Sequence, residues 1–392
     1  MLRIDQESHY VRRATVTLLS VACFGGFFTP LESQAIDYQV YVGTYTHGES
    51  QGIYTFEFDS ENGVVGKARL VAESENPSFL AIHPSGKVLY AVNETNEFEG
   101  AASGSISSYF IGNEGGLEFL NRRPSGGAAP CHLVLDATGT NLLVANYNGG
   151  NVASFRLNET GGIGERTTLI QHLGSSINRR RQNEAHAHSI NLDGGNRHAV
   201  AADLGVDKLF VYPFDEVTGM LHLRDANSVS LPAGAGPRHF SFHPNGSLAF
   251  VNNELHSSLT SLRYSSEEGA LTVIETASTL PGDYQGGNST AETRVHPNGN
   301  FVYVSNRGHD SIAVFVVDQH SGRLRLVEIE PTQGRTPRNF CLSPEGDYLF
   351  AANQGSDSVV IFNVNADSGR LEGAGVSVDV PNPVCVRFLR LN

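Results

Sequence analysis

The sequence contains charged side chains that could bind an anion and transfer protons if the fold brought them together. Arginine pairs with carboxylate and phosphate groups, and histidine and glutamate act as general acids or bases. The residues with this potential are His188, Arg238, Glu254, Arg307 and Arg338. They lie far apart in the chain, so the elements that would position them have to be identified first.

A short apolar segment recurs seven times, with copies about 50 residues apart. The copies are YVGTY (41–45), YAVNE (90–94), LVANY (143–147), VAADL (200–204), FVNNE (250–254), YVSNR (303–307) and FAANQ (350–354). Most follow a strand that ends in a Pro- or Gly-containing turn, and most precede two further strands joined by an acidic turn with Gly. Four alternating strands per repeat are typical of a propeller blade. The repeat therefore predicts an all-β, seven-bladed β-propeller.

The two ends of the chain predict how the ring closes. The first copy, at 41–45, has no strand before it, and the segment 383–388 has no strand after it. We expect this C-terminal strand to join the N-terminal blade as its innermost strand, which leaves no open edge. Residues 36–392 would then form one domain. A linear array of repeats is the alternative, but it leaves both end segments unpaired.

Aligning the repeats places the charged residues at one end of the blades. The positions that begin the first strand of each blade are Ser78, Cys131, His188, Arg238, Ala291, Arg338 and Val384. The positions that end the second strand are Tyr45, Glu94, Tyr147, Leu204, Glu254, Arg307 and Gln354. First and second strands are antiparallel neighbours, so both sets should lie on one face of the disc. We interpret this face as a binding site. The alternative is that each charge only caps its own strand end.

Composition and the other motifs restrict the possible functions. The net charge of −14 argues against nucleic acid and anionic membranes as partners. His186 and His188 share one face of an extended strand, but no further ligand completes a metal site, so we expect neither metal nor cofactor. The run Arg179-Arg180-Arg181 is either a solvated loop or a basic loop that overhangs the pocket. The cysteines beyond the leader, Cys131, Cys341 and Cys385, are predicted to be buried free thiols.

The first 35 residues differ from the repeats. Arg12 and Arg13 precede an apolar run at 14–28, and Ser33-Gln34-Ala35 offers small residues for cleavage. This pattern predicts a signal peptide and therefore a periplasmic or secreted protein. The alternatives are a disordered extension or a misassigned start, with a cytoplasmic protein.

Several segments resemble the lactonase family of seven-bladed propellers. They are PCHL (130–133), LLVANYNGGNVASF (142–155), HAHSI (186–190), GPRHF (236–240), VNNEL (251–255), YVSNRGHDSIAVF (303–315), TPRNF (336–340) and AANQ (351–354). The likeness extends over about residues 38–390, with the blades in order. It implies a lactone hydrolase acting on a sugar-acid lactone, with 6-phosphogluconolactone as the expected substrate. The alternatives are a cycloisomerase that closes a muconate-type acid to a lactone, and a propeller that only binds partners.

The resemblance also implies roles for individual residues. The motifs that carry the family's active-site set correspond here to His186 or His188, Arg238, Glu254 and Arg307, of which we assign His188, Arg238, Glu254 and Arg307 to catalysis. We predict substrate contacts from His186, Arg338, Gln354, His132 and Glu94. The expected partner is a small anionic lactone bound by a monomer. Arg238 would stabilise the oxyanion, Glu254 or His188 would accept a proton from water, and Arg307 with Arg338 would bind the substrate's anionic group.

Overall fold

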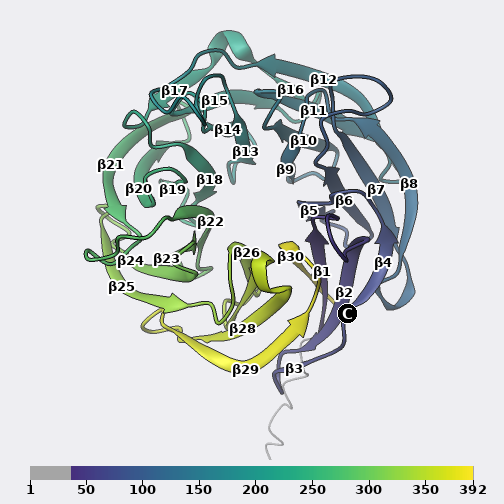
Figure 1. Ribbon diagram of the computed structural model, residues 1–392. Coiled ribbons are helices and arrows are strands. Elements are labelled where there is room, and N and C mark those ends of the chain that lie inside the picture. Colours follow the sequence, from purple (N-terminus) through teal and green to yellow (C-terminus); the bar gives the residue numbers. More distant parts are fainter. Residues whose placement is uncertain (1–36, 392) are drawn as a thin grey trace, which may run out of the picture. The chain divides into compact units, whose positions relative to one another are not determined.

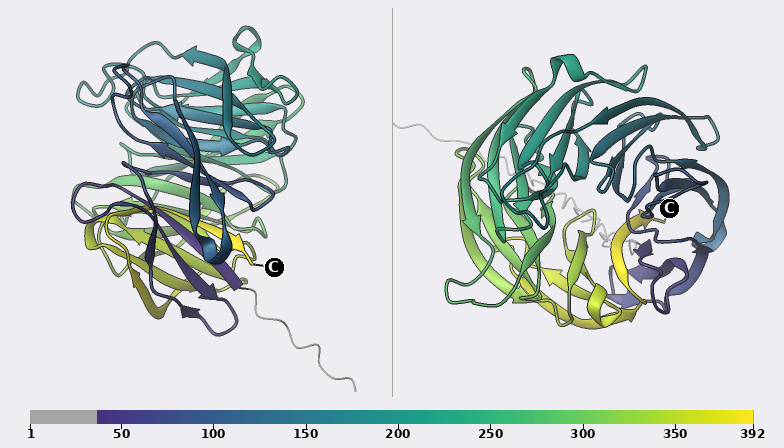
Figure 2. Two further views of the ribbon diagram at one scale, coloured as in Figure 1. Left: turned by 90° about the vertical axis from the view of Figure 1, so that its right-hand side faces the viewer. Right: turned by 45° about the horizontal axis from the view of Figure 1, so that its top comes forward.

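The computed structural model describes residues 37–391, which form seven antiparallel sheets set as blades around a central axis (Figure 1). Figure 2 shows the same ring from the side and tilted forward. The arrangement confirms the predicted all-β, seven-bladed propeller. The predicted leader, residues 1–35, lies outside the described residues. Within residues 37–391, no helix is long and apolar enough to cross a membrane.

The first four blades follow one another along the chain. Blade 1 contains β1 (Asp37–Thr44), β2 (Gly52–Asp59), β3 (Val64–Val65) and β4 (Arg69–Glu73). Blade 2 contains β5 (Leu80–Ile82), β6 (Val88–Asn93), β7 (Ser105–Ile111) and β8 (Leu117–Pro124). Blade 3 contains β9 (Pro130–Leu135), β10 (Asn141–Asn146), β11 (Asn151–Leu157) and β12 (Ile163–Gln171). Blade 4 contains β13 (Ala187–Leu192), β14 (His198–Asp203), β15 (Lys208–Asp215), β16 (Met220–Leu221) and β17 (Asn227–Ser230).

The remaining blades complete the circle. Blade 5 contains β18 (Pro237–Phe242), β19 (Leu248–Asn253), β20 (Ser258–Ser265) and β21 (Ala270–Ser278). Blade 6 contains β22 (Ser289–Val295), β23 (Phe301–Arg307), β24 (Ser311–Val317) and β25 (Leu324–Pro331). Blade 7 contains β26 (Pro337–Leu342), β27 (Tyr348–Asn353), β28 (Ser358–Val364) and β29 (Leu371–Asp379), and the chain then reaches β30 (Pro383–Arg390). Three short 3₁₀ turns, η1 (Asn113–Gly115), η2 (Leu223–Asp225) and η3 (Gln354–Ser356), are the helical elements of the described residues.

The last strand closes the ring. β30 pairs antiparallel with β1, with Tyr41 opposite Arg387 and Val42 opposite Val386, so blade 1 combines the two ends of the described chain (Figure 1). Both edges that an open repeat would expose are thereby paired. The predicted closure by the C-terminal strand is confirmed.

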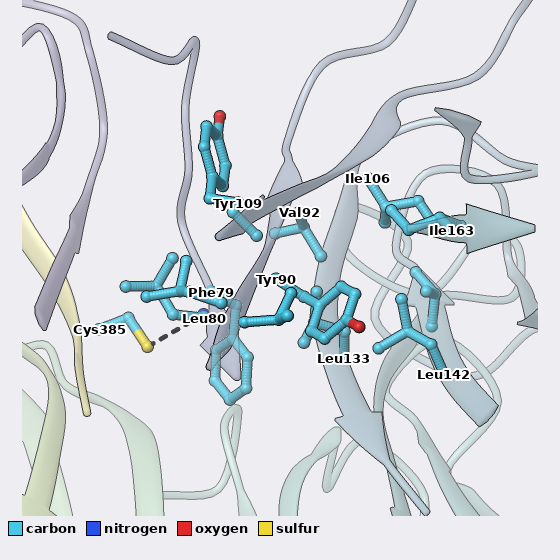
Figure 3. Close-up of a cluster of buried hydrophobic side chains, with 14 of the residues drawn as sticks. Phe79, Leu80, Tyr90, Val92, Ile106, Tyr109, Leu133, Leu142, Ile163 and Cys385 are labelled. Atoms are coloured by element: carbon cyan, nitrogen blue, oxygen red, sulfur yellow. Dashed lines mark hydrogen bonds between the residues drawn. The ribbon is translucent and has the colours of Figure 1, made fainter. Parts of the chain in front are cut away.

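Each second strand lies inside the packed core. All six residues of β6, β10 and β19 are buried, because each strand is flanked within its sheet and covered by the neighbouring blades. Outer strands such as β12 are more exposed, with only two of its nine residues buried. Figure 3 shows one interblade cluster, in which Tyr90, Leu133 and Cys385 contribute from three different blades.

Turn histidines link consecutive blades on the face opposite the start of the first strands. Nε2 of His243 lies 2.7 Å from the carbonyl oxygen of Gly299 in the next blade, and Nδ1 accepts the Asn245 amide hydrogen. Nδ1 is therefore unprotonated, and Nε2 donates to Gly299. His83 with Gly139 and His296 with Gly346 repeat the arrangement, so one hydrogen bond per turn ties these blades together.

A β-bulge interrupts most of the first strands near their beginning. In β13, Ala187 pairs with Asp203 and Ser189 with Ala202, so His188 is an extra residue without a partner in the ladder. In β26, Pro337 pairs with Asn353 and Asn339 with Ala352, which leaves Arg338 in the same position. Comparable shifts occur in β9, β18, β22 and β30. Such a bulge re-aims a side chain, here at the end of the strand where the charged residues lie.

Candidate active site

One cavity of about 340 Å³ lies where the first strands of the blades begin. It is lined by Glu94, Cys131, Tyr147, Arg181, His188, Arg238, Glu254, Ser289, Arg307 and Arg338. Larger hollows, up to about 790 Å³, lie elsewhere, but none has a lining with comparable charge. The charge of its lining, rather than its size, marks this cavity as the candidate active site.

Glu254 is the centre of an ion-pair network. Its Oε1 lies 2.7 Å from Nη2 of Arg181, and its Oε2 lies 3.1 Å from both Nη1 of Arg238 and Nη2 of Arg307. Burial alone would raise the pKa of Glu254, but the Arg307, Arg238 and Arg181 cations overcome it and hold the pKa well below its usual range. Glu254 is therefore ionised at neutral pH and a weak base.

The backbone fixes both ends of this network. The Glu254 amide donates to the Gly236 carbonyl oxygen at 2.7 Å, which keeps the residue after β19 beside the beginning of β18. Gly236 has φ +65°, and a Cβ there would meet the Leu255 side chain, so glycine suits this turn. Arg238 Nε donates to the Ala291 carbonyl at 2.9 Å, and Arg307 Nη2 to that of Thr290 at 3.0 Å. Arg238 is thus held against blade 6, the blade to which Arg307 belongs.

His188 lies deep in the cavity, with a side chain that is 5 % exposed. Nη1 of Arg238 contacts its Nε2, and Sγ of Cys131 lies 3.6 Å from its Nδ1. Burial lowers the pKa of His188 well below its ordinary value, and the Arg238 cation lowers it further. A guanidinium can only donate, so the imidazole beside it is neutral and its Nε2 is an acceptor. Burial raises the pKa of the Cys131 thiol, which stays protonated.

Arg338 forms the opposite wall. Its Nη2 donates to the Tyr45 hydroxyl at 2.7 Å, and its guanidinium lies 5.0 Å from the centre of the Tyr45 ring. The Tyr45 hydroxyl in turn lies 2.9 Å from Oε2 of Glu94, which also accepts from Ser78. Burial lowers the pKa of Arg307 to about 9, with further lowering by the Arg238 and Arg338 cations, so it remains charged at neutral pH. Among the described residues that line the cavity, four guanidinium groups face two carboxylates, a surplus of two positive charges.

The structure brings most of the predicted site residues together. His188, Arg238, Glu254, Arg307, Arg338 and Glu94 line the cavity, whereas His186, His132 and Gln354 do not. His186 stacks on the Tyr147 ring, and its Nδ1 lies 3.0 Å from the Tyr147 carbonyl oxygen. Gln354 begins η3, and its amide donates to the Thr336 carbonyl. The predicted substrate contacts of these three residues therefore lack support from their positions.

His132 belongs to a second polar layer, one residue further along the axis. Its ring packs against Phe79 and His239, and Nδ1 of His239 lies 3.0 Å from Oε1 of Glu292. Burial lowers the pKa of His239 to about 4, although Glu292 opposes the effect. His132 directly follows Cys131, which belongs to an aligned set, so the sequence does not separate this layer from the cavity. Within residues 37–391, no group of three His, Cys, Asp or Glu side chains could hold a metal ion.

Sequence reasoning did not assign four of the lining residues to the site: Cys131, Tyr147, Arg181 and Ser289. Cys131 and Tyr147 belong to the two aligned sets, but only charged residues in those sets indicated a binding site, and both of these are neutral. Arg181 stood in a basic run whose position over the pocket was one of two alternatives. The long loop that carries it, 172–186, was the available signal.

The fold and the basic cavity at one end of its axis define a propeller of the lactonase class. The family model for the seven-bladed β-propeller lactonases matches residues 39–388, and the chain belongs to this family. It is 37 % identical over 350 residues to the 6-phosphogluconolactonase of Bacillus subtilis (strain 168), an alignment that covers 89 % of this chain and 97 % of the relative. The 6-phosphogluconolactonase of Formosa agariphila is 33 % identical, with 77 % of this chain and 86 % of that relative covered.

A solved structure shows the same fold. The periplasmic gluconolactonase of Pseudomonas aeruginosa superimposes with a TM-score of 0.84 at 32 % sequence identity, covering 90 % of this chain and 99 % of the other. The similarity therefore extends over the whole propeller.

Proposed function

We propose that the protein hydrolyses a sugar-acid lactone, with 6-phosphogluconolactone converted to 6-phosphogluconate as the expected reaction. The observation that carries the proposal is the convergence of His188, Arg238, Glu254 and Arg307 on one cavity with a surplus of positive charge. The names of the relatives support hydrolysis over lactone formation from a muconate-type acid. An anionic substrate suits four guanidinium groups.

Arg238 is the group best placed to act on the reacting carbonyl. It is 3 % exposed, and Glu254 and the Ala291 carbonyl fix its orientation before substrate arrives. A donor that is already oriented stabilises the oxyanion without a reorganisation cost during the reaction. When the lactone carbonyl takes up a hydrogen bond from Arg238, the contact between Arg238 and His188 is released.

His188 is the better general base of the two candidates. Three arginines occupy both oxygens of Glu254, whereas the neutral His188 has an acceptor at Nε2 that becomes available when Arg238 turns to the substrate. Nε2 takes a proton from water as the water oxygen bonds to the carbonyl carbon. The tetrahedral intermediate then breaks the ring C–O bond, and the proton on Nε2 passes to the leaving oxygen. Glu254 positions Arg238 and Arg307 throughout.

The test offers the purified full-length protein three compounds: 6-phosphoglucono-δ-lactone, glucono-δ-lactone and cis,cis-3-carboxymuconate. Acid release is followed in a weakly buffered indicator assay for the lactones, after subtraction of spontaneous hydrolysis, and the loss of diene absorbance is followed for the muconate. Catalysed hydrolysis of a lactone supports the proposal. Turnover of the muconate alone, or of none of the three, refutes it.

Location and assembly complete the proposal. We infer that residues 1–35 are a signal peptide that directs the protein to the periplasm or the medium, and that the mature protein is a monomer without nucleic acid or membrane partners. The periplasmic relative from P. aeruginosa supports the location. Mass measurement of the native N-terminus tests the cleavage, and an uncut terminus excludes it. Light scattering on the mature protein tests the assembly, and a dimer mass excludes the monomer.

A further inference from the structure

One link between blades is much longer than the rest. Residues 172–186 connect β12 to β13 with fifteen residues, whereas the other links between blades in the described chain have three to ten. All these links run on the face that carries the cavity, because each leads into the beginning of a first strand. Loops set on a rigid scaffold at a site commonly carry its specificity.

Internal contacts hold this loop in a fixed shape. Gln182 is fully buried, and its Nε2 donates to the Leu204 carbonyl and to Oδ1 of Asp207, each at 2.8 Å. The Asn178 amide donates to Oε1 of Gln182 at 3.1 Å, and the Gln182 amide donates back to the Asn178 carbonyl at 2.7 Å. The loop therefore presents Arg181, next to Gln182, at a defined position.

Arg181 approaches Glu254 from the mouth of the cavity. Its side chain is 40 % exposed, against 3 % for Arg238 and 13 % for Arg307. It contacts Oε1 of Glu254, whereas the other two arginines share Oε2. Its contacts to Glu254 and to the Tyr147 hydroxyl both use Nη2. Among the described residues, Nε and Nη1 of Arg181 have no hydrogen-bond acceptor, so one side of the guanidinium can still receive a ligand.

The position of the reacting carbonyl determines what Arg181 meets. If the carbonyl lies against Arg238 and His188, both buried, then the substituents remote from it point to the mouth. Arg338 lies on the other wall of the cavity, where its Nη2 donates to the Tyr45 hydroxyl and its guanidinium lies over the Tyr45 ring. Arg179 and Arg180 precede Arg181 on the same loop and are exposed to solvent. A phosphate there would find a planar donor pair that matches two of its oxygens.

We propose that Arg181 determines specificity, by binding the anionic group that a sugar lactone carries away from its reacting carbonyl. The site thereby selects phosphorylated over unphosphorylated lactones. This inference rests on the proposed lactonase function. It assigns Arg181 to the substrate-binding site. It also predicts a preference for phosphorylated lactones, which lactone hydrolysis alone does not require.

The experiment compares kcat/KM for 6-phosphoglucono-δ-lactone and for glucono-δ-lactone in the full-length protein and in Arg181→Gln, Arg181→Lys, Arg180→Gln and Arg338→Gln. We expect Arg181→Gln to lower the ratio of the two values about ten- to hundredfold, the loss of a charge-assisted hydrogen-bond pair. Arg181→Lys should restore part of it because it keeps the charge. Arg180→Gln, on the same loop but exposed, is the matched control and should leave the ratio within about twofold, since surface charges act weakly.

The outcomes separate the two proposals. A wild-type protein that hydrolyses neither lactone refutes the proposed function. A wild-type protein that hydrolyses lactones without preferring the phosphorylated one overturns only the role of Arg181. An unchanged ratio in Arg181→Gln does the same, as does a larger loss of preference in Arg338→Gln. Competition by 6-phosphogluconate and by gluconate repeats the comparison without turnover: Arg181→Gln should raise the inhibition constant of 6-phosphogluconate far more than that of gluconate.

Discussion

Nη1 of Arg238 lies 3.1 Å from Oε2 of Glu254, although the two residues stand at opposite ends of a strand pair in the sequence. The register brings the two residues near each other: Pro237 pairs with Asn253, so Glu254 lies beside Gly236, two residues before Arg238. The bulge after Pro237 directs the arginine into the cavity instead of along the ladder. Glu254 of this pair also binds the other two arginines of the network, Arg181 and Arg307.

Removal of either proposed reactive group should abolish most of the activity. Arg238→Ala and His188→Ala are each expected to lower kcat/KM more than about tenfold, since loss of an oxyanion donor or a general base has effects of this size or larger. Initial lactone hydrolysis rates test this, with circular dichroism to verify folding. Arg224→Ala, at an exposed arginine in η2, provides the comparison. Unchanged hydrolysis in both site variants would remove these residues from the mechanism.

Glu254 should be important for stability as well as for activity. Glu254→Gln leaves three arginines around an uncharged group, two of them largely buried, and breaking a buried ion pair in this way costs about 3–5 kcal/mol. Urea unfolding measures the change. Glu328→Gln is the control, because Glu328 pairs with Arg370, whose side chain is 59 % exposed, and such pairs contribute about 0–1 kcal/mol. Equal effects in the two variants would show that the central network is not stabilising.

Activity should change little as the solution becomes mildly acidic. A histidine of ordinary pKa that acts as a base loses about nine-tenths of its unprotonated form between pH 7.5 and 5.5. Burial and Arg238 hold the pKa of His188 well below its ordinary value, so its unprotonated form persists to lower pH than in an ordinary histidine. We expect kcat/KM to vary less than about twofold over this interval. Rates corrected for spontaneous hydrolysis at each pH test it, and a decline that follows a pKa near 6.5 would contradict it.

Stability, in contrast, should fall over part of the acidic range. Burial lowers the pKa of His239 to about 4 in the folded protein, so between pH 6.5 and 4 the unfolded chain binds a proton that the folded chain does not. The folded state is therefore penalised as the pH falls, by about 3 kcal/mol at pH 4. Urea unfolding at pH 7 and pH 4.5 measures this. His239→Gln, which does not titrate, should show a smaller dependence, and an equal dependence would exclude His239 as a source.

The interblade hydrogen bonds of the turn histidines should contribute to stability without affecting the site. His243→Ala removes the donor to the Gly299 carbonyl, and a lost hydrogen bond in a buried setting costs about 1–3 kcal/mol. His320→Ala, in an exposed turn, is the matched control. Thermal unfolding and lactone turnover are measured together. A loss of turnover at retained stability would show that His243 acts on the cavity.

The fold could be predicted from the sequence because the repeat is regular. Copies such as FVNNE and YVSNR share spacing, turns and flanking strands, and the unpaired segment at 383–388 predicts the closure. The polarity of the second strands was predicted less well. Strands such as β6 and β19 are buried on both faces, so they are apolar up to their terminal asparagines rather than alternating.

The sequence predicted which ends of the strands form the site, but not which side chains at those ends reach the cavity. Alignment found Arg238 and Glu254 because sister positions are mostly neutral. It could not distinguish His188 from His186, because the two residues are only two positions apart. In the structure His188 lies on a bulge that faces the cavity, whereas His186 stacks on Tyr147. Arg181 comes from a loop outside the repeat, and no repeat-based reasoning can position such a residue.

The pairing of β30 with β1 has a consequence for biosynthesis. The partner of the first described strand consists of residues 383–390, so blade 1 cannot be completed until this distant part of the chain has been synthesised. Contacts between such distant residues form slowly because the intervening chain must first be ordered. The nascent protein therefore remains an open arc while blades 2 to 7 are synthesised, and the ring closes only when β30 reaches β1.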